Sequence, residues 1–269
     1  MSVEIAENKH AWGQLSESHY HTFKQRFADG THQLNSHILA EIGDLTGKRV
    51  IHLQCNTGAD TILLALLGAS EVVGVDLVPD NIKFATQLAA DLGVSNVQFV
   101  ESDLMEIMDL DLGKFDVVFT SEGALGWLPD LGYWGRAIRN LLDDDGYLYA
   151  FEGHPIYLMF DEGKLAQGEV AIKYPYFERQ PDLSESIGGY AGDSVGGVRA
   201  HFWMYQISDL INSLTDAGLH INYFHEFVEQ FFDPGGAVPV GPGLYNYPFN
   251  TGLFPQSFSL KATVYPRII

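Results

Sequence analysis

The sequence is short of cysteine and of basic residues. Its 269 residues include one cysteine, Cys55, so a disulfide framework is excluded. Fifteen lysines and arginines stand against 35 aspartates and glutamates, which gives a formal net charge of −20. A nucleic-acid groove needs clustered cations, and the sequence shows no such cluster, so no nucleic-acid partner is expected. The same acidity disfavours adhesion to anionic membranes.

Long hydrophobic runs are also missing. No stretch approaches the roughly 18 apolar residues of a membrane span. The first ten residues, MSVEIAENKH, have neither a basic region nor an apolar run, so we expect no signal peptide and a cytoplasmic protein. The chain does have 46% apolar residues, which is ample for one large α/β domain with insertions.

One stretch, residues 49–76, has the pattern of a strand, a helix and a second strand. Val50–Leu53 and Glu71–Asp76 are short apolar runs, typical of buried parallel strands. Residues 60–67 between them repeat apolar side chains at helical spacing. Residues 54–58 would then place backbone N–H groups at a helix N-terminus, beside the acid that closes the second strand.

That acid, Asp76, predicts a nucleoside ligand. It lies eighteen positions after Gly58, and a spacing of about 20 suits a carboxylate that accepts hydrogen bonds from ribose hydroxyls. A dinucleotide is disfavoured, because the glycine positions of G-x-G-x-x-G are Gln54, Asn56 and Ala59. A Walker loop is excluded, since no Lys-Ser or Lys-Thr pair follows a glycine there.

Residues 50–58, V-I-H-L-Q-C-N-T-G, resemble the V-L-D-L-G-C-G-T-G signature of class I S-adenosylmethionine-dependent methyltransferases. His52 stands where an acid is usual, and Gln54 and Asn56 stand where glycines are usual. HLQC-x-x-G-x-D-T, a later GWLPDL and a strand ending in E-x-H-P are similar to a bacterial subgroup whose substrates are mostly unassigned. The resemblance covers residues 10–265.

The resemblance implies a fold and a domain division. The expected fold is α/β: a doubly wound, Rossmann-like sheet of seven strands in the order 3-2-1-4-5-7-6, with the last strand antiparallel. Residues 1–45 would form an N-terminal helical lid, and residues 156–200 an inserted cap over the active site. Residues 46–155 and 201–269 would form the methyltransferase core.

The resemblance also implies S-adenosylmethionine as the cofactor, with no metal. Asp76 would hold the ribose, and Leu77 and Asp103 would lie by the adenine, although Asp103 also fits the N-cap of a following helix. The methionine end would lie by the first loop and after the fourth strand. The expected cofactor contacts are Tyr20, Gln54, Asn56, Thr57, Gly58, Asp76, Leu77, Asp103, Leu104, Thr120, Ser121, Glu122 and Trp127.

The catalytic candidates follow the fifth strand, expected at residues 147–151 after a turn at residues 143–146. His154 is the best candidate for a general base, because an unperturbed imidazole titrates near neutrality. Glu152 could orient it or bind the acceptor. Alternatively, both side chains tie down the following loop. If His154 is the base, its loss lowers turnover and spares cofactor affinity.

Aromatic side chains are expected to bind the acceptor. Trp127 has no helix or sheet face to fill, so its ring could carry adenine or the sulfonium, or plug the space beneath the lid. A later helix is expected from Asp209, with Ser208 as its N-cap. The expected acceptor contacts are Trp12, His19, Trp127, His154, Tyr157 and Trp203.

The leading hypothesis is a methyltransferase that acts on an oxygen or nitrogen of a small, aromatic or apolar metabolite. The alternative is a non-catalytic, nucleoside-binding or regulatory protein that keeps the fold. An NAD-dependent oxidoreductase ranks third, because the loop lacks its glycines. A homodimer stays open, and Cys55 is expected to pack the loop rather than act as a nucleophile.

Overall fold

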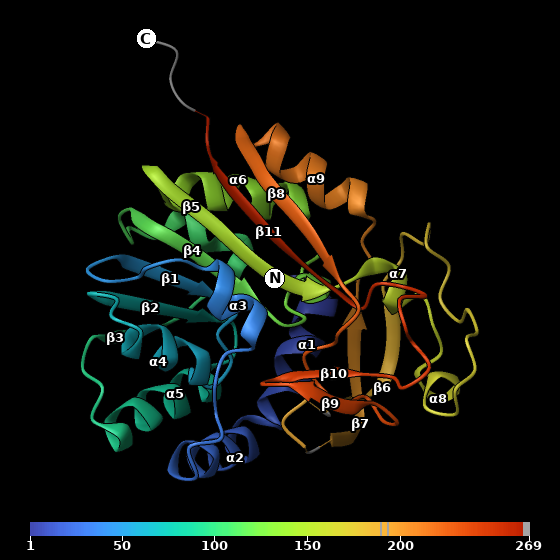
Figure 1. Ribbon diagram of the computed structural model, residues 1–269. Helices are drawn as coiled ribbons and strands as arrows, with labels where there is room; N and C mark the ends of the chain where they lie inside the picture. The colour runs from blue at the N-terminus through green and yellow to red at the C-terminus, as the bar shows by residue number, and fades with distance from the viewer. Residues whose placement is uncertain (189, 193, 266–269) are drawn as a thin grey trace.

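The computed structural model describes residues 1–188, 190–192 and 194–265. Within these residues the centre is a seven-stranded sheet (Figure 1). Its strands, in spatial order, are β3 (Val97–Glu101), β2 (Glu71–Asp76), β1 (Arg49–Leu53), β4 (Phe115–Ser121), β5 (Leu142–Gly153), β11 (Ser257–Val264) and β8 (Leu219–Phe227). β11 runs antiparallel to both of its neighbours, and the other adjacent pairs are parallel. The predicted strand order is confirmed.

Helices cover both faces of the sheet. One face carries α3 (Ser36–Glu41), α4 (Ala59–Leu66) and α5 (Pro79–Leu92), and the other carries η1 (Leu104–Asp109), α6 (Leu131–Leu141) and α9 (Ile207–Asp216). Successive side chains of a strand point to opposite faces. In β1, Val50 therefore packs with Leu64 of α4, whereas Ile51 and Leu53 belong to the core that holds Trp134 of α6.

The remaining elements gather at one end of the sheet. α1 (Val3–Gly13) packs against β7 (Ser194–Phe202), and α2 (Ser16–Ala28) packs against α5. β6 (Asp182–Gly188) and β7 form an antiparallel hairpin, which follows the short helices α7 (Pro155–Leu158) and α8 (Glu162–Leu165). A second hairpin consists of β9 (Val238–Gly241) and β10 (Leu244–Asn246). The hairpins lie beside α1 at the lower right of Figure 1.

Two expected boundaries were wrong. The acidic residues 143–145 belong to β5, not to a turn, because Leu142 already pairs with Phe115 and a register shift follows in β4. The N-cap of α9 is Gln206, not Ser208, since the Asp209 carboxylate accepts from the Gln206 N–H at 3.0 Å. Gly189 of the expected cap and residues 266–269 of the expected core lie outside the described residues.

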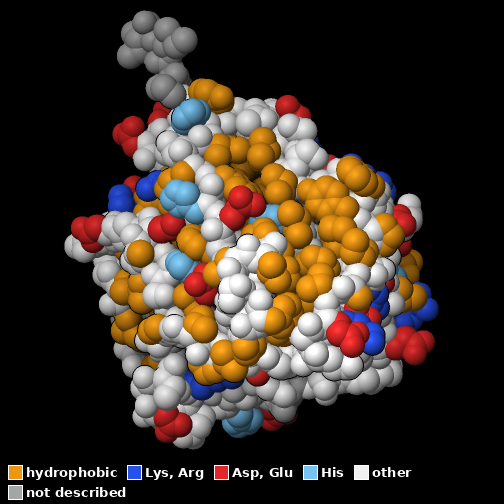
Figure 2. Space-filling view, turned by 45° about the vertical axis from the view of Figure 1, so that its right-hand side comes forward, with side chains coloured by type: hydrophobic (Ala, Val, Ile, Leu, Met, Phe, Trp, Pro, Cys, Tyr) orange, Lys and Arg blue, Asp and Glu red, His pale blue; other side chains and the backbone are white. Residues whose placement is uncertain are grey.

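The surface over the two hairpins and their connections is unusually apolar. Figure 2 shows hydrophobic side chains gathered across this side of the molecule. Val170, Ile172, Phe177, Val238 and Val240 are all exposed there. Across the part of the chain that the structure describes, every helix is too short or too polar to cross a lipid bilayer.

Candidate active site

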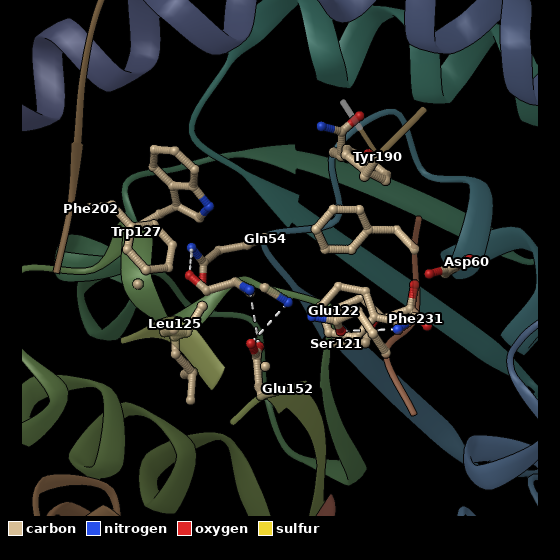
Figure 3. Close-up of a pocket in the computed structure, with 18 of the residues that line it drawn as sticks. Gln54, Asp60, Ser121, Glu122, Leu125, Trp127, Glu152, Tyr190, Phe202 and Phe231 are labelled. Atoms are coloured by element: carbon tan, nitrogen blue, oxygen red, sulfur yellow. Dashed lines mark hydrogen bonds between the residues drawn. The ribbon is translucent and has the colours of Figure 1, made fainter. Parts of the chain in front are cut away.

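A cavity of about 870 Å³ opens at the carboxyl ends of β1, β2, β4 and β5 (Figure 3). This edge is where ligands bind in open α/β sheets, since the strand order reverses there. The lining comes from the loops that follow these strands, from the N-terminal segment and from the two hairpin regions. Trp127 and Phe202 lie on one side in Figure 3, and Phe231 and Asp60 lie on the other.

The loop after β1 has the left-handed backbone conformation typical of glycine at two positions where other residues stand. Gln54 has φ +57° and Asn56 has φ +48°, in the left-handed region that glycine enters without steric penalty. Asn56 accepts from the Thr57 N–H through its own side chain at 2.7 Å, and Asn tolerates this conformation well. Gln54 Nε2 donates to the Ala124 carbonyl at 2.9 Å, which ties the loop to the segment after β4.

Gly58 is needed for packing. Its φ is +76°, and an added Cβ would lie 2.6 Å from the Phe99 ring and 2.8 Å from the Ala85 Cβ. It is not among the residues that line the cavity, so its expected cofactor contact stays a prediction. Its role is to let α4 start directly against α5 and β3, which sets the position of the loop before it.

Asp76 lines the cavity at the end of β2. Its carboxylate accepts from the Val78 N–H at 2.9 Å, from Asn81 Nδ2 at 3.0 Å and from the Asn56 N–H at 2.8 Å. Burial raises the pKa of this carboxyl to about 6, although these hydrogen bonds oppose the shift. Because a carboxylate has about four lone-pair sites, these donors leave room for a ribose hydroxyl.

Further polar atoms beside Asp76 fit a polar ligand. Gln54 Oε1 and Thr57 Oγ1 are buried and have no hydrogen-bond partner among the described residues. Both residues line the cavity. Buried polar atoms are normally satisfied, so a ligand hydroxyl or amino group would satisfy Gln54 Oε1, and the Thr57 hydroxyl could also donate to a ligand carboxylate. The residues present at this loop therefore fit a nucleoside that carries an amino-acid moiety.

Two carboxyl groups, the buried Glu152 and the half-buried Glu122, face the cavity from the ends of β5 and β4. Glu152 accepts from the Gly123 N–H at 2.9 Å and the Ala124 N–H at 3.0 Å, bonds drawn in Figure 3. Glu122 has φ +59° and accepts from Asn35 Nδ2 at 2.9 Å. Burial raises the pKa of each carboxyl to about 8, and the nearby charge of Asp60 adds to the shift at Glu122.

These pKa values predict that stability falls as pH rises. The native carboxyls hold their protons up to a pKa of about 8, whereas the ordinary pKa is 4.5. Between these values the native state binds more protons than the unfolded state, so alkali favours unfolding. We expect the Tm to fall between pH 5.5 and 8.5, measured by differential scanning fluorimetry, and to fall less in Glu152→Gln. If the Tm of the parent protein and of Glu152→Gln changed equally with pH, the raised pKa of Glu152 would be contradicted.

Sequence reasoning missed a His–Asp pair in this cavity. His32 Nε2 lies 3.2 Å from Asp60 Oδ1, and both residues line the cavity. Burial alone would raise the pKa of Asp60, but His32 and His52 lower it on balance. Asp60 stands within the quoted HLQC-x-x-G-x-D-T motif, which was the available signal. His32 lies in the segment between α2 and α3, where no sequence motif pointed to it.

The structure brings most of the expected cofactor contacts together. Those that line the cavity are Gln54, Asn56, Thr57, Asp76, Leu77, Ser121, Glu122 and Trp127. Tyr20 does not reach it, because its hydroxyl donates to Asp91 at 2.5 Å and its ring stacks on Phe84, so that it anchors α2 to α5. Leu104 and Thr120 are buried outside the cavity lining.

Asp103 lies at a separate, smaller hollow that it shares with Leu77. Its carboxylate accepts from the Met105 N–H at 2.9 Å and caps η1, as expected for an N-cap. The main cavity does not include it. Its expected contact with adenine therefore stays a prediction that depends on a ligand reaching past Leu77.

The expected acceptor residues divide in the same way. Trp12, Trp127, Tyr157 and Trp203 line the cavity. Trp127 makes edge contacts with Trp12 of α1 and Phe202 of β7, both at 5.1 Å between ring centroids. It thus joins the N-terminal helices to the hairpin and still faces the cavity. His19 is buried, with Nδ1 3.1 Å from Asn56 Oδ1, and supports the first loop instead.

The structure does not support His154 as the general base. Its side chain is fully buried and is absent from the cavity lining, although its neighbours Gly153 and Pro155 contribute to it. Nδ1 accepts from the Ile156 N–H at 3.0 Å and caps α7, and Nε2 lies 2.9 Å from Glu226 Oε1. A neutral imidazole in this arrangement has no lone pair left for a substrate proton. These contacts fit the alternative role of His154, in which its side chain ties down the following loop.

His154→Ala is therefore expected to lower stability and to spare turnover. Loss of an N-cap typically destabilises by about 1 kcal/mol. Urea denaturation should show this loss, and His154→Asn, which can still cap a helix, should recover much of it. Turnover measured well below the Tm should stay within about twofold of the parent. A folded His154→Ala protein without turnover would restore the base assignment.

Two residues behind the loop support it from the core. His52 is buried, its Nδ1 lies 2.9 Å from Thr61 Oγ1, and burial lowers its pKa to about 4. Cys55 is buried, and burial raises the pKa of its thiol well above its usual range, which does not suit a nucleophile. Among the described residues, no group of His, Cys, Asp and Glu side chains is arranged to hold a metal ion.

The middle of the chain matches a known protein family. A family model described as a methyltransferase domain matches residues 44–155, which carry β1 to β5. The chain is 38% identical over 81 residues to a Methanocaldococcus jannaschii protein provisionally named a protein N5-glutamine methyltransferase. That match covers 30% of this chain and 39% of the relative.

Other relatives have different named substrates. A ubiquinone biosynthesis O-methyltransferase of Neisseria meningitidis is 29% identical over 106 residues, covering 39% of this chain and 44% of the relative. A 23S rRNA (uracil-C5)-methyltransferase of Shewanella sediminis is 38% identical over 86 residues, covering 31% of this chain and 19% of the relative. This chain thus spans less than half the length of these curated relatives.

Solved structures share the whole fold. The DhpI–SAH complex is 16% identical to this chain, and the alignment covers 98% of each chain with a TM-score of 0.56. At this identity the likeness concerns the fold. It extends beyond the matched domain to the N-terminal segment and the later strands, since nearly all of both chains aligns.

Proposed function

Residues 44–155 are a methyltransferase domain on a class I S-adenosylmethionine-dependent methyltransferase fold, and from this premise we propose that the protein methylates an oxygen or nitrogen of a small acceptor. The observation that carries the proposal is the continuous cavity, which joins Asp76 and the first loop to the aromatic rings of the N-terminal and hairpin regions. One end of it suits a nucleoside, and the other suits an apolar or aromatic body.

Different residues of this chain would bind different parts of the cofactor. Asp76 would accept from the ribose, and Gln54, Asn56 and Thr57 would meet the amino-acid end of the cofactor. The cofactor supplies a methyl group already activated by a sulfonium. The protein then has to align the acceptor with that group and exclude water. Trp127, with Trp12 and Phe202 against it, would form a wall of the cavity and help to exclude water.

A small acceptor is favoured over a macromolecular one by the walls of the cavity. The relatives are named for protein, rRNA and ubiquinone-pathway substrates. Residues of the N-terminal helices and of the β6–β7 hairpin line the cavity and pack against one another, which would narrow the approach of a large acceptor. Its lining is rich in carboxylates, which would repel a phosphate backbone. We place the N-terminal segment as a lid and the hairpin region as a cap in this proposal.

Calorimetric titration with S-adenosylmethionine, S-adenosylhomocysteine and NAD tests the cofactor. We expect saturable binding of both sulfur nucleosides and none of NAD. If folded protein binds none of them, the replaced glycines have removed the site and the protein is a non-catalytic relative.

A labelling experiment tests the size of the acceptor. The protein is incubated with a cell extract and S-adenosylmethionine that carries a labelled methyl group. Label in the low-molecular-mass filtrate supports a small acceptor. Label confined to ribonuclease-sensitive or protease-sensitive material contradicts it.

A further inference from the structure

We propose that the methyl acceptor is a protonated amine on an apolar body, and that Glu122 binds its ammonium group and takes its proton. This inference rests on the proposed methyl transfer and names its substrate class. Glu122 stands at the end of β4, next to Ser121 and the ring of Phe231 in Figure 3. It therefore faces the cavity where the loops after β1 and β4 meet, across the switch in strand order.

The charge of the cavity favours a cation. Among the described residues, carboxyl groups of seven residues line it, and the one lysine or arginine is Arg26. Arg26 is engaged elsewhere, since its guanidinium lies 5.4 Å from the centroid of the Phe23 ring and donates to the Ala191 carbonyl at 3.5 Å. Before a substrate binds, burial holds Glu122 and Glu152 protonated up to a pKa of about 8. A bound ammonium favours the ionised form of a neighbouring carboxyl, whereas a phenolate or carboxylate acceptor disfavours it.

One oxygen of the Glu122 carboxyl is open to a ligand. Asp76 accepts from three neighbouring donors, Glu152 holds the backbone of Gly123 and Ala124, and Asp60 lies against His32. Within the described residues, the hydrogen bond to the Glu122 side chain is the one from Asn35 to Oε1. That leaves Oε2 to accept from an ammonium N–H.

The surrounding rings suit the rest of such a substrate. Phe231, Tyr190, Trp127 and Phe202 line the same cavity as Glu122. Aromatic faces attract cations and pack against apolar groups. A carboxyl beside one ring, with further rings across the cavity, is a combination that can recognise an organic ammonium ion, in contrast to the guanidinium or lysine that recognises an acid.

In the proposed reaction, proton transfer to Glu122 precedes methyl transfer. The bound ammonium gives a proton to the Glu122 carboxylate, which leaves a neutral amine with a free lone pair. The amine attacks the methyl carbon; the C–N bond forms as the carbon–sulfonium bond breaks, and that electron pair stays on sulfur. The product is an N-methylammonium ion, and Glu122 later releases its proton to water. Before a substrate binds, burial raises the pKa of Glu122 to about 8. The bound ammonium favours the ionised carboxylate, and the raised pKa makes that carboxylate a stronger base than an ordinary glutamate.

The test compares acceptors that share one ring and differ in the nucleophile: 2-phenylethylamine, 3-phenylpropanoate and 4-ethylphenol. S-adenosylhomocysteine production is measured for each, and cofactor affinity is measured separately by calorimetry. We expect turnover of the amine in preference to the other two. In Glu122→Gln, kcat/KM for the amine should fall by about 100-fold, whereas the Kd for S-adenosylhomocysteine should stay within about twofold.

The pH profile separates proton transfer from simple positioning. Above the pKa of the free amine the acceptor is already neutral, so the defect of Glu122→Gln should shrink there. Glu185→Gln, an exposed glutamate of β6 outside the cavity, should behave like the parent throughout. If Glu122→Gln fails to fold, Glu122→Asn replaces it, because Asn tolerates the left-handed backbone at this position.

Three outcomes would overturn the inference. Preferred methylation of the phenol or the acid would reject the substrate class. Full amine turnover in folded Glu122→Gln would reject the residue. A tenfold loss of S-adenosylhomocysteine affinity in that variant would assign Glu122 to the amino group of the cofactor instead. By contrast, failure of the parent protein to bind either sulfur nucleoside would reject the proposed function itself.

Discussion

Asp76→Ala is expected to weaken the binding of S-adenosylmethionine by about 1–3 kcal/mol, or roughly 5- to 150-fold in Kd. The carboxylate would accept from a ribose hydroxyl, and it also orders the first loop through the Asn56 N–H at 2.8 Å. Its loss would leave that N–H, the Val78 N–H and Asn81 Nδ2 without their acceptor in a buried site. The ribose hydroxyl that loses its acceptor in the complex accounts for the expected loss of affinity, whereas the donors of the protein that lose theirs lower stability.

Calorimetry with folded protein measures this change. Asp80→Ala is the matched control, because Asp80 is an exposed acid four residues further along the chain, in the first turn of α5. It should leave the Kd unchanged. Because Asp76→Ala also removes hydrogen bonds of the native state, its melting curve must be recorded first. An unchanged Kd in well-folded Asp76→Ala protein would remove Asp76 from the ligand site.

Trp134→Ala is expected to lower the free energy of unfolding by about 3–5 kcal/mol. Trp134 is fully buried in the core between α6 and the sheet. It lies beside Gly135, where an added Cβ would come within 2.2 Å of the Ser213 carbonyl of α9, so the two helices cannot easily move together to fill the space. A cavity that cannot collapse gives the upper part of the expected range.

Urea denaturation measures this loss. Trp134→Phe should lose less, since a ring remains and the indole N–H has no hydrogen-bond partner among the described residues. Arg136→Ala, at an exposed position of the same helix, should change the free energy of unfolding by less than about 0.5 kcal/mol. A loss below 1 kcal/mol in Trp134→Ala would mean that the core repacks around the missing indole.

The acceptor side of the site was less predictable than the cofactor side. The loop after β1 and the acid that closes β2 are neighbours in sequence pattern as well as in space, because a βαβ unit brings them to one edge. Glu122 was expected at the ligand, but not its partner Asn35, which lies 87 positions away in sequence. The surroundings of His154 could not be derived from its position at the end of β5, because Glu226 of β8 and the start of α7, which engage its ring, are set by the tertiary structure.

The sequence by itself determined the local features of this protein. Apolar runs, helical spacing and the acid at Asp76 depend on neighbours within one strand–helix–strand unit, so that unit and its candidate ligand edge could be derived from them, whereas the order of the seven strands came from the family resemblance. The tertiary structure alone decided which polar side chains face the cavity and which cap the N-termini of helices. It also decided the pKa of Glu122 and Glu152, since these shifts come from burial by segments far apart in the chain.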